Sequence, residues 1–74
     1  MTTRYHINIF YSVEDRGYIA DVPDLIACAA FGRTPEAALG AVRKAQRAWL
    51  AAARAAGKPI PIARYRPAIY QIAQ

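Results

Sequence analysis

Apolar and polar residues alternate along the first part of the chain. This period of two is the pattern of a β-strand with one buried face, although Phe10 interrupts the polar side. The charged segment 14–17 ends in a glycine and predicts a turn, in which Gly17 is suited to positive φ, and residues 18–22 resume an extended run. Residues 5–22 therefore predict a β-hairpin whose first strand buries Tyr5, Ile7, Ile9 and Tyr11.

A third strand is expected at residues 26–31, which are small and apolar, although alanine is a poor strand former. The composition then changes abruptly to that of a helix start. Thr34 can cap a helix with its hydroxyl group, Pro35 suits the first helical position, and Glu36 lies favourably against the helix dipole. The order is therefore three strands followed by a helix.

The helix is expected from Pro35 to about Ala56, with Gly57 in the left-handed conformation at its end. Its apolar positions form one broad stripe, anchored by Trp49. The stripe consists of Ala38, Leu39, Val42, Ala45, Gln46, Trp49, Leu50 and Ala53. Residues 58–61, Lys-Pro-Ile-Pro, predict a stiff extended connector, and residues 68–73 predict a last short strand after Pro67.

These elements predict one α+β domain spanning residues 1–74, with the order β-β-β-α-β and the helix lying across one face of a mainly antiparallel sheet. One helix covers only part of such a sheet. We therefore expect Phe10, Ile19 and Phe31 to be partly open, and an open apolar face usually serves interaction. The core of a 74-residue chain is also small, so self-association is a natural supplement.

The chain carries a formal net charge of +5, from ten Lys and Arg against five Asp and Glu. All five acidic residues precede residue 37, whereas most of the cations follow residue 32. Nothing approaches the roughly 20 apolar residues of a membrane span, the N-terminus lacks the apolar core of a signal peptide, and Cys28 has no partner for an intramolecular disulfide. We expect a cytoplasmic protein.

Candidate catalytic residues are few. His6 is the only histidine, and it lies on the polar face of the first strand without a second candidate nearby. Cys28 lies among apolar residues, where a small thiol packs well. Asp21 and Asp24 form the only close pair of aspartates, which is thin support for a metal site. The chain is therefore expected to have no enzymatic activity, no metal site and no cofactor.

Two interpretations remain open for the cations of the helix and of the segment after it. Either they form a solvated polar face, or they contact the phosphates of a nucleic acid, with Tyr65 and Tyr70 adding stacking. The candidate phosphate contacts are Arg43, Arg47, Arg54, Arg64 and Arg66.

Four motifs in order resemble the HicB family of antitoxins. They are the strand opening at Tyr5, the segment 17–25 (Gly-Tyr-Ile-Ala-Asp-Val-Pro-Asp-Leu), the run from Cys28 to Leu39 containing Gly32, Thr34, Pro35 and Glu36, and the segment 57–61 (Gly-Lys-Pro-Ile-Pro). Two positions depart from the family pattern: Ala27 stands where a glycine usually precedes the cysteine, and Ala37 stands where an acidic residue is usual.

The resemblance implies a partial RNase H-like fold and a non-catalytic antitoxin that neutralises a HicA-type mRNA-cleaving toxin. It also implies a homo-oligomer, a dimer or a tetramer. The toxin-contacting residues would be Tyr18, Asp21, Pro23 and Asp24, whose acidic pair suits a basic toxin. Many family members carry a further DNA-binding segment, and operator binding is not expected of this polypeptide. The alternative is a stand-alone nucleic-acid-binding protein.

Overall fold

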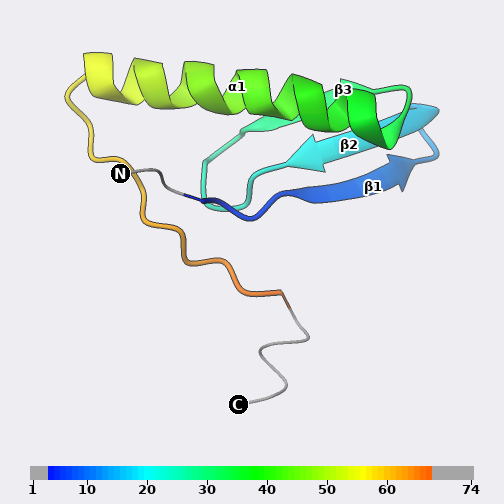
Figure 1. Ribbon diagram of the computed structural model, residues 1–74, viewed down its shortest axis with the longest axis horizontal. Helices are drawn as coiled ribbons and strands as arrows, with labels where there is room; N and C mark the ends of the chain where they lie inside the picture. Colours follow the sequence, from blue (N-terminus) through cyan, green and yellow to red (C-terminus); the bar gives the residue numbers. More distant parts are fainter. Residues whose placement is uncertain (1–3, 68–74) are drawn as a thin grey trace.

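The sheet and the helix of this protein form two layers in the computed structural model, which describes residues 4–67 (Figure 1). The strands are β1 (Asn8–Ser12), β2 (Gly17–Asp21) and β3 (Ala29–Gly32), and the helix is α1 (Pro35–Ala55). The strands lie in the order β1-β2-β3 and both pairings are antiparallel. The predicted α+β class, with three antiparallel strands before one long helix, is confirmed. The last strand expected at residues 68–73 lies outside the described residues.

The β1–β2 hairpin closes differently from the sequence prediction. The positive φ of the turn belongs to Arg16, at 55°, and not to Gly17. Gly17 is instead the buried first residue of β2. A Cβ at this position would lie 2.5 Å from the ring of Phe31, so the glycine makes room for that ring on the neighbouring strand. The requirement for glycine here is therefore one of packing.

Both ends of α1 have the predicted caps. The Thr34 hydroxyl accepts a hydrogen bond of 3.0 Å from the backbone N–H of Ala37, and Pro35 occupies the first turn. At the other end Gly57 has φ 69°, its N–H donates to the Arg54 carbonyl, and the Lys58 N–H donates to the Ala53 carbonyl. This pair of bonds is the Schellman motif, which satisfies the last carbonyl groups. No helix within residues 4–67 has the length and apolar content needed to cross a bilayer.

The core lies between α1 and the sheet, and the largest side chains that are fully buried there are Val22, Leu25 and Val42. The predicted helix stripe is confirmed, since Ala38, Val42 and Ala53 are buried and its other members are half-buried. α1 packs chiefly on β3 and β2 and only slightly on β1.

The prediction that the first strand buries Tyr5, Ile7, Ile9 and Tyr11 is right for only two of the four residues. Tyr5 is buried and Ile7 is half-buried, as expected. Ile9 and Tyr11 also point to the helix side, because they pair with Ala20 and Tyr18, but they remain exposed. The helix does not extend far enough over β1 to cover them.

Three backbone hydrogen bonds lie within the loop between β2 and β3, and one side-chain hydrogen bond joins the loop to α1. Val22 and Cys28 close the loop through a 2.9 Å bond between the Val22 N–H and the Cys28 carbonyl. The indole N–H of Trp49 donates to the Ile26 carbonyl over 2.9 Å, which ties the loop to α1. Ala27, in the same loop, has φ 60°.

Two glycines give opposite predictions for stability. Gly40 lies inside α1 with open space around a would-be Cβ, so Gly40→Ala should raise the free energy of unfolding by about 0.5–1 kcal/mol. Gly57 has equally open surroundings but a positive φ, so Gly57→Ala should lower it by about 1 kcal/mol. Urea denaturation followed by circular dichroism measures both. Changes in the free energy of unfolding that have the same sign in the two variants would contradict the roles given to these glycines.

Candidate binding surfaces

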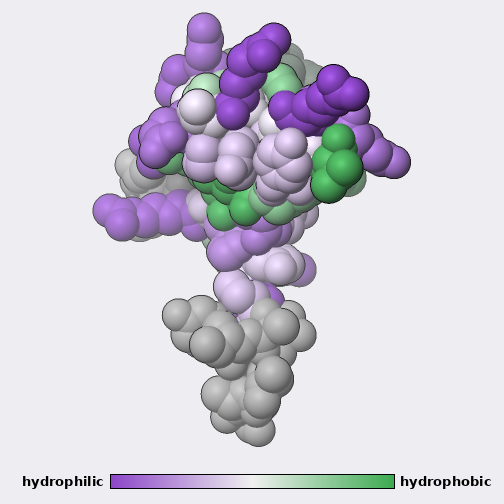
Figure 2. Space-filling model, turned by 90° about the vertical axis from the view of Figure 1, so that its right-hand side faces the viewer, coloured by the Kyte–Doolittle hydropathy of each residue, from purple (hydrophilic) through white to green (hydrophobic). Residues whose placement is uncertain are grey.

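The face of the sheet opposite α1 carries an apolar row across all three strands. Phe10, Ile19 and Phe31 are cross-strand neighbours in the register, so their side chains lie side by side on this face. Phe10 and Phe31 are exposed, and Ile19 between them is half-buried. We call this row and its neighbours Asn8, Asp21 and Ala29 the open face. Figure 2, which views the end of the molecule with the β1–β2 turn, shows apolar surface at the exterior beside charged side chains.

The open face has a single charge, that of Asp21. This residue pairs with Asn8 on one side and Ala29 on the other, one step along the strands from the apolar row. No other residue of β1, β2 or β3 is charged. An apolar row with a carboxylate at its border therefore faces away from the helix, on a protein whose other charges are mostly positive.

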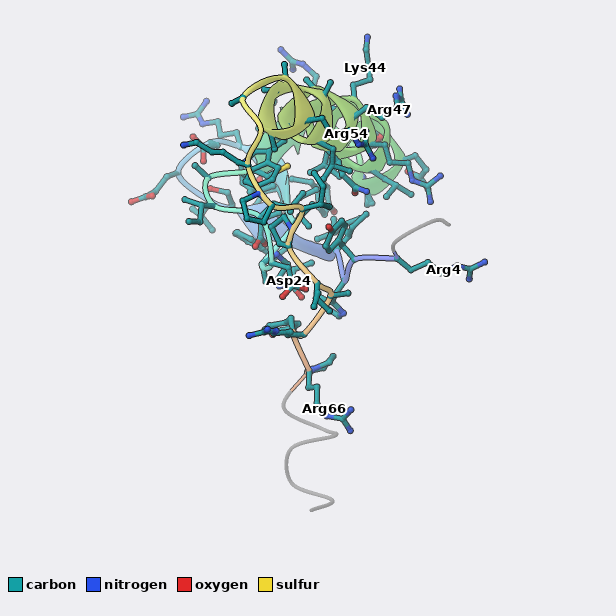
Figure 3. The ribbon with its side chains drawn as sticks, turned by 90° about the vertical axis from the view of Figure 1, so that its left-hand side faces the viewer. Arg4, Asp24, Lys44, Arg47, Arg54 and Arg66 are labelled. Atoms are coloured by element: carbon teal, nitrogen blue, oxygen red, sulfur yellow. The ribbon has the colours of Figure 1, made fainter. Side chains whose placement is uncertain are left out.

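Asp24 has a structural task that the sequence did not predict. Its carboxylate accepts hydrogen bonds from the backbone N–H groups of Arg64 and Tyr65, each at 3.1 Å. The extended segment 58–67 is thereby fastened beside the loop that holds Asp24 (Figure 3). The hydroxyl group of Tyr5 donates to the Pro61 carbonyl and fastens the same segment closer to α1. One feature of the sequence points to such an anchor. The proline-rich run after the helix cannot continue as a helix, so its backbone N–H and C=O groups need partners elsewhere.

The four predicted toxin-contacting residues do not form one surface. Tyr18 lies on the helix side of the sheet, where its ring meets the ring of Tyr11 edge-on with centroids 5.3 Å apart. Asp21 lies on the open face, whereas Pro23 and Asp24 belong to the loop that follows β2. Of the four, Asp21 is the residue that borders the exposed apolar row.

The predicted phosphate-contacting arginines fall into two groups. Arg43, Arg47 and Arg54 are exposed, and their spacing places them on one side of α1. Figure 3 shows Arg47 and Arg54, with Lys44 further round the helix. Arg64 and Arg66 lie on the extended segment, with Arg66 far from the helix. Within residues 4–67 no ion pair joins Arg43, Arg47 or Arg54 to an acidic side chain. These three arginines form one cationic stripe that spans about three turns of α1.

His6 and Cys28 occupy sites that serve packing and hydrogen bonding. The His6 Nε2 lies 2.7 Å from the Asn8 Oδ1, and its ring stacks at a tilt on that of Tyr65. Cys28 is buried, and burial, with a smaller contribution from the charge of Asp21, raises the pKa of its thiol. The described residues contain no group of three or more His, Cys, Asp or Glu side chains placed to hold a metal ion.

An apolar groove of 520 Å³ lies between the β2–β3 loop and the end of α1. Ile26, on the loop, is highly exposed. Trp49, on α1, donates its indole N–H to the Ile26 carbonyl and so joins the two sides of the groove. The lining residues are Ile26, Trp49, Ala52, Ala53, Ala56, Lys58 and Pro59.

Comparison of the chain with protein families, with curated proteins and with solved structures gave no match.

The buried thiol gives a prediction for reactivity. At pH 8 Cys28 should react with Ellman's reagent at least tenfold more slowly in the native protein than in urea, because it is buried and its raised pKa leaves little thiolate. Equal rates in the two conditions would contradict a buried thiol.

Protein stability should follow the same pKa. The stabilisation that comes from a neutral buried thiol is complete below the ordinary pKa of cysteine, about 8.5, and is lost as the pH rises through the raised value. The stability advantage of the wild type over Cys28→Ala should therefore be smaller at pH 10 than at pH 7, in urea titrations at both values.

Proposed function

We propose that this protein is a HicB-like antitoxin module that binds and neutralises a HicA-type mRNA-cleaving toxin in the cytoplasm, without chemistry of its own. The observation that carries the proposal is the open face, where Phe10, Ile19 and Phe31 form an exposed row bordered by Asp21. Protein interfaces combine such an apolar centre with a polar rim.

Charge complementarity supports the same surface. A toxin that binds RNA presents cations at its active surface, and a binding partner gains specificity and association rate by presenting the opposite charge. On this protein the cationic stripe lies on α1, on the other side of the sheet from the open face. A basic partner approaching the open face meets Asp21 and does not meet the arginines of the helix.

The conformation of Ala27 supports the resemblance on which the toxin assignment rests. The HicB pattern usually has glycine at this position, and Ala27 has φ 60°, a value that glycine adopts without the cost borne by other residues. The backbone at Ala27 thus has the conformation that the family's usual glycine would favour, although the residue itself is alanine.

The direct test is binding of purified HicA-type toxins, measured by calorimetry, together with growth rescue on co-expression. Asp21→Asn should weaken binding by about tenfold, since it removes one charge beside the interface. Glu14→Gln is the matched control, because Glu14 carries the same charge on the exposed β1–β2 turn, and it should leave the affinity unchanged.

Absence of binding, or an equal loss from Glu14→Gln, would contradict the proposed surface. Asp24 variants are unsuitable for this test. Removing the Asp24 carboxylate would also remove its hydrogen bonds to the backbone N–H groups of Arg64 and Tyr65.

A second candidate function is nucleic-acid binding through the cationic stripe, which is favoured by the exposure of Arg43, Arg47 and Arg54 along one side of α1. If these three arginines contact phosphates of a single strand, the logarithm of the affinity should fall with the logarithm of salt concentration with a slope of about −2. The triple substitution to Glu should abolish binding of a labelled RNA in fluorescence polarisation. Retention of binding, or a slope near zero, would rule out this function.

A further inference from the structure

The β2–β3 loop presents an isoleucine to solvent beside the apolar groove at the end of α1. Ile26 is 84% exposed, more than any other large apolar side chain of residues 4–67. A single exposed apolar residue is ordinary on a protein surface. Ile26 differs because it lines a groove that continues across the loop and the helix through Trp49, Ala53 and Pro59. Its side chain therefore belongs to one continuous apolar surface.

The loop holds Ile26 in this position against a steric cost. Ala27, the next residue, has φ 60°, where the Cβ of any residue other than glycine is crowded. Trp49 donates its only polar hydrogen to the Ile26 carbonyl over 2.9 Å. Backbone strain of this kind persists where the surrounding contacts impose it, and it is found chiefly at binding and catalytic sites. The exposure of Ile26 is therefore fixed by contacts on both sides of the groove.

The shape of the groove favours a peptide as its occupant. Its volume of 520 Å³ lies within the range of small-molecule sites, about 300–1,000 Å³, but such sites enclose most of their ligand. Here four of the lining residues are themselves exposed: Ala52, Ala56, Lys58 and Pro59. A groove with exposed walls covers one side of its occupant. This suits an apolar side chain that a peptide carries into the groove while the peptide backbone stays outside it.

The charge at the groove favours an acidic occupant. Among the described residues that line the groove, Lys58 is the only one with an ionisable side chain. Within residues 4–67 its ammonium group forms no ion pair. The carboxylate of Asp24, in the same loop as Ile26, is already bonded to the backbone of segment 58–67. A carboxylate supplied by a partner would therefore complement Lys58.

We propose that this groove is a docking site for an acidic peptide segment of another protein. One large apolar side chain of that segment lies in the groove against Ile26 and Trp49, and a neighbouring carboxylate pairs with Lys58. An apolar anchor in a pocket beside a charged rim is the usual arrangement of such contacts.

The site is separate from the two surfaces already described. The spacing of residues 49, 52, 53 and 56 places them on one side of α1, away from the cationic stripe. The open face lies on the other side of the sheet from α1. The peptide site therefore adds a second binding surface, for a partner of the opposite charge to the toxin.

Peptide selection on the full-length protein tests the chemistry of the occupant. A phage-displayed library of random peptides should yield sequences in which Leu or Phe stands near Asp or Glu. Trp49 is the only tryptophan of the chain and lines the groove, so its fluorescence reports occupancy directly. A synthetic peptide made from the selected sequence should change the Trp49 emission in a saturable way.

Two pairs of variants test the position of the site, with fluorescence polarisation of the labelled peptide at about 0.15 M ionic strength. Ile26→Ser should weaken binding at least tenfold. Its matched control is Ile62→Ser, which changes another highly exposed isoleucine that does not line the groove. Lys58→Glu should also weaken binding at least tenfold, whereas Lys44→Glu makes the same change of charge on an exposed part of α1 and should leave the affinity within twofold.

Four results would overturn the proposal. They are selected peptides without acidic residues, binding that leaves the Trp49 emission unchanged, equal losses within either pair of variants, and equal saturation of the Trp49 signal by free 4-methylpentanoate, which would assign the groove to a small acid. A Trp49 emission that shifts on dilution without peptide would assign it to a second copy and overturn the proposal as well. These measurements use neither toxin nor RNA, so their failure leaves both proposed functions untouched.

Discussion

The close approach of the end of β3 to the first turn of α1 determines how the two layers meet. Gly32 is buried there, and a Cβ on it would lie 2.2 Å from the backbone nitrogen of Ala38. Only glycine allows the backbones of strand and helix to come so near. Because the chain enters α1 directly from β3, the helix is placed over β3 and β2 and reaches β1 only slightly.

The open face follows from that placement. A single helix on one side of the sheet leaves the other side as the open face, with Phe10, Ile19 and Phe31 in one row. Its position over β2 and β3 also leaves Ile9 and Tyr11 of β1 exposed on the helix side of the sheet.

Segment 58–67 shows how polar side chains hold an extended stretch of backbone that follows a helix. Segment 58–67 crosses from the end of α1 past residues 5 and 6, and its backbone is held by Tyr5 and Asp24. Asp24 thereby joins the loop after β2 to residues 40 and 41 positions later in the chain. A residue that charge alone would assign to a partner surface is in this case a structural anchor.

The sequence by itself determined the order of three strands and one helix, because strand alternation, helix caps and the apolar stripe of α1 are local patterns. It placed the third strand at residues 26–31, whereas β3 is Ala29–Gly32. Thr34 and Pro35 marked the start of the helix and Gly57 its end, and Phe10, Ile19 and Phe31 were expected to be partly open. Only the tertiary structure decided that Ile9 and Tyr11 are exposed, that Asp24 binds backbone N–H groups of the C-terminal segment, and that Tyr18 and Asp21 lie on opposite faces. These facts depend on where α1 crosses the sheet and on contacts between distant segments, and neither is encoded in the period of a single element.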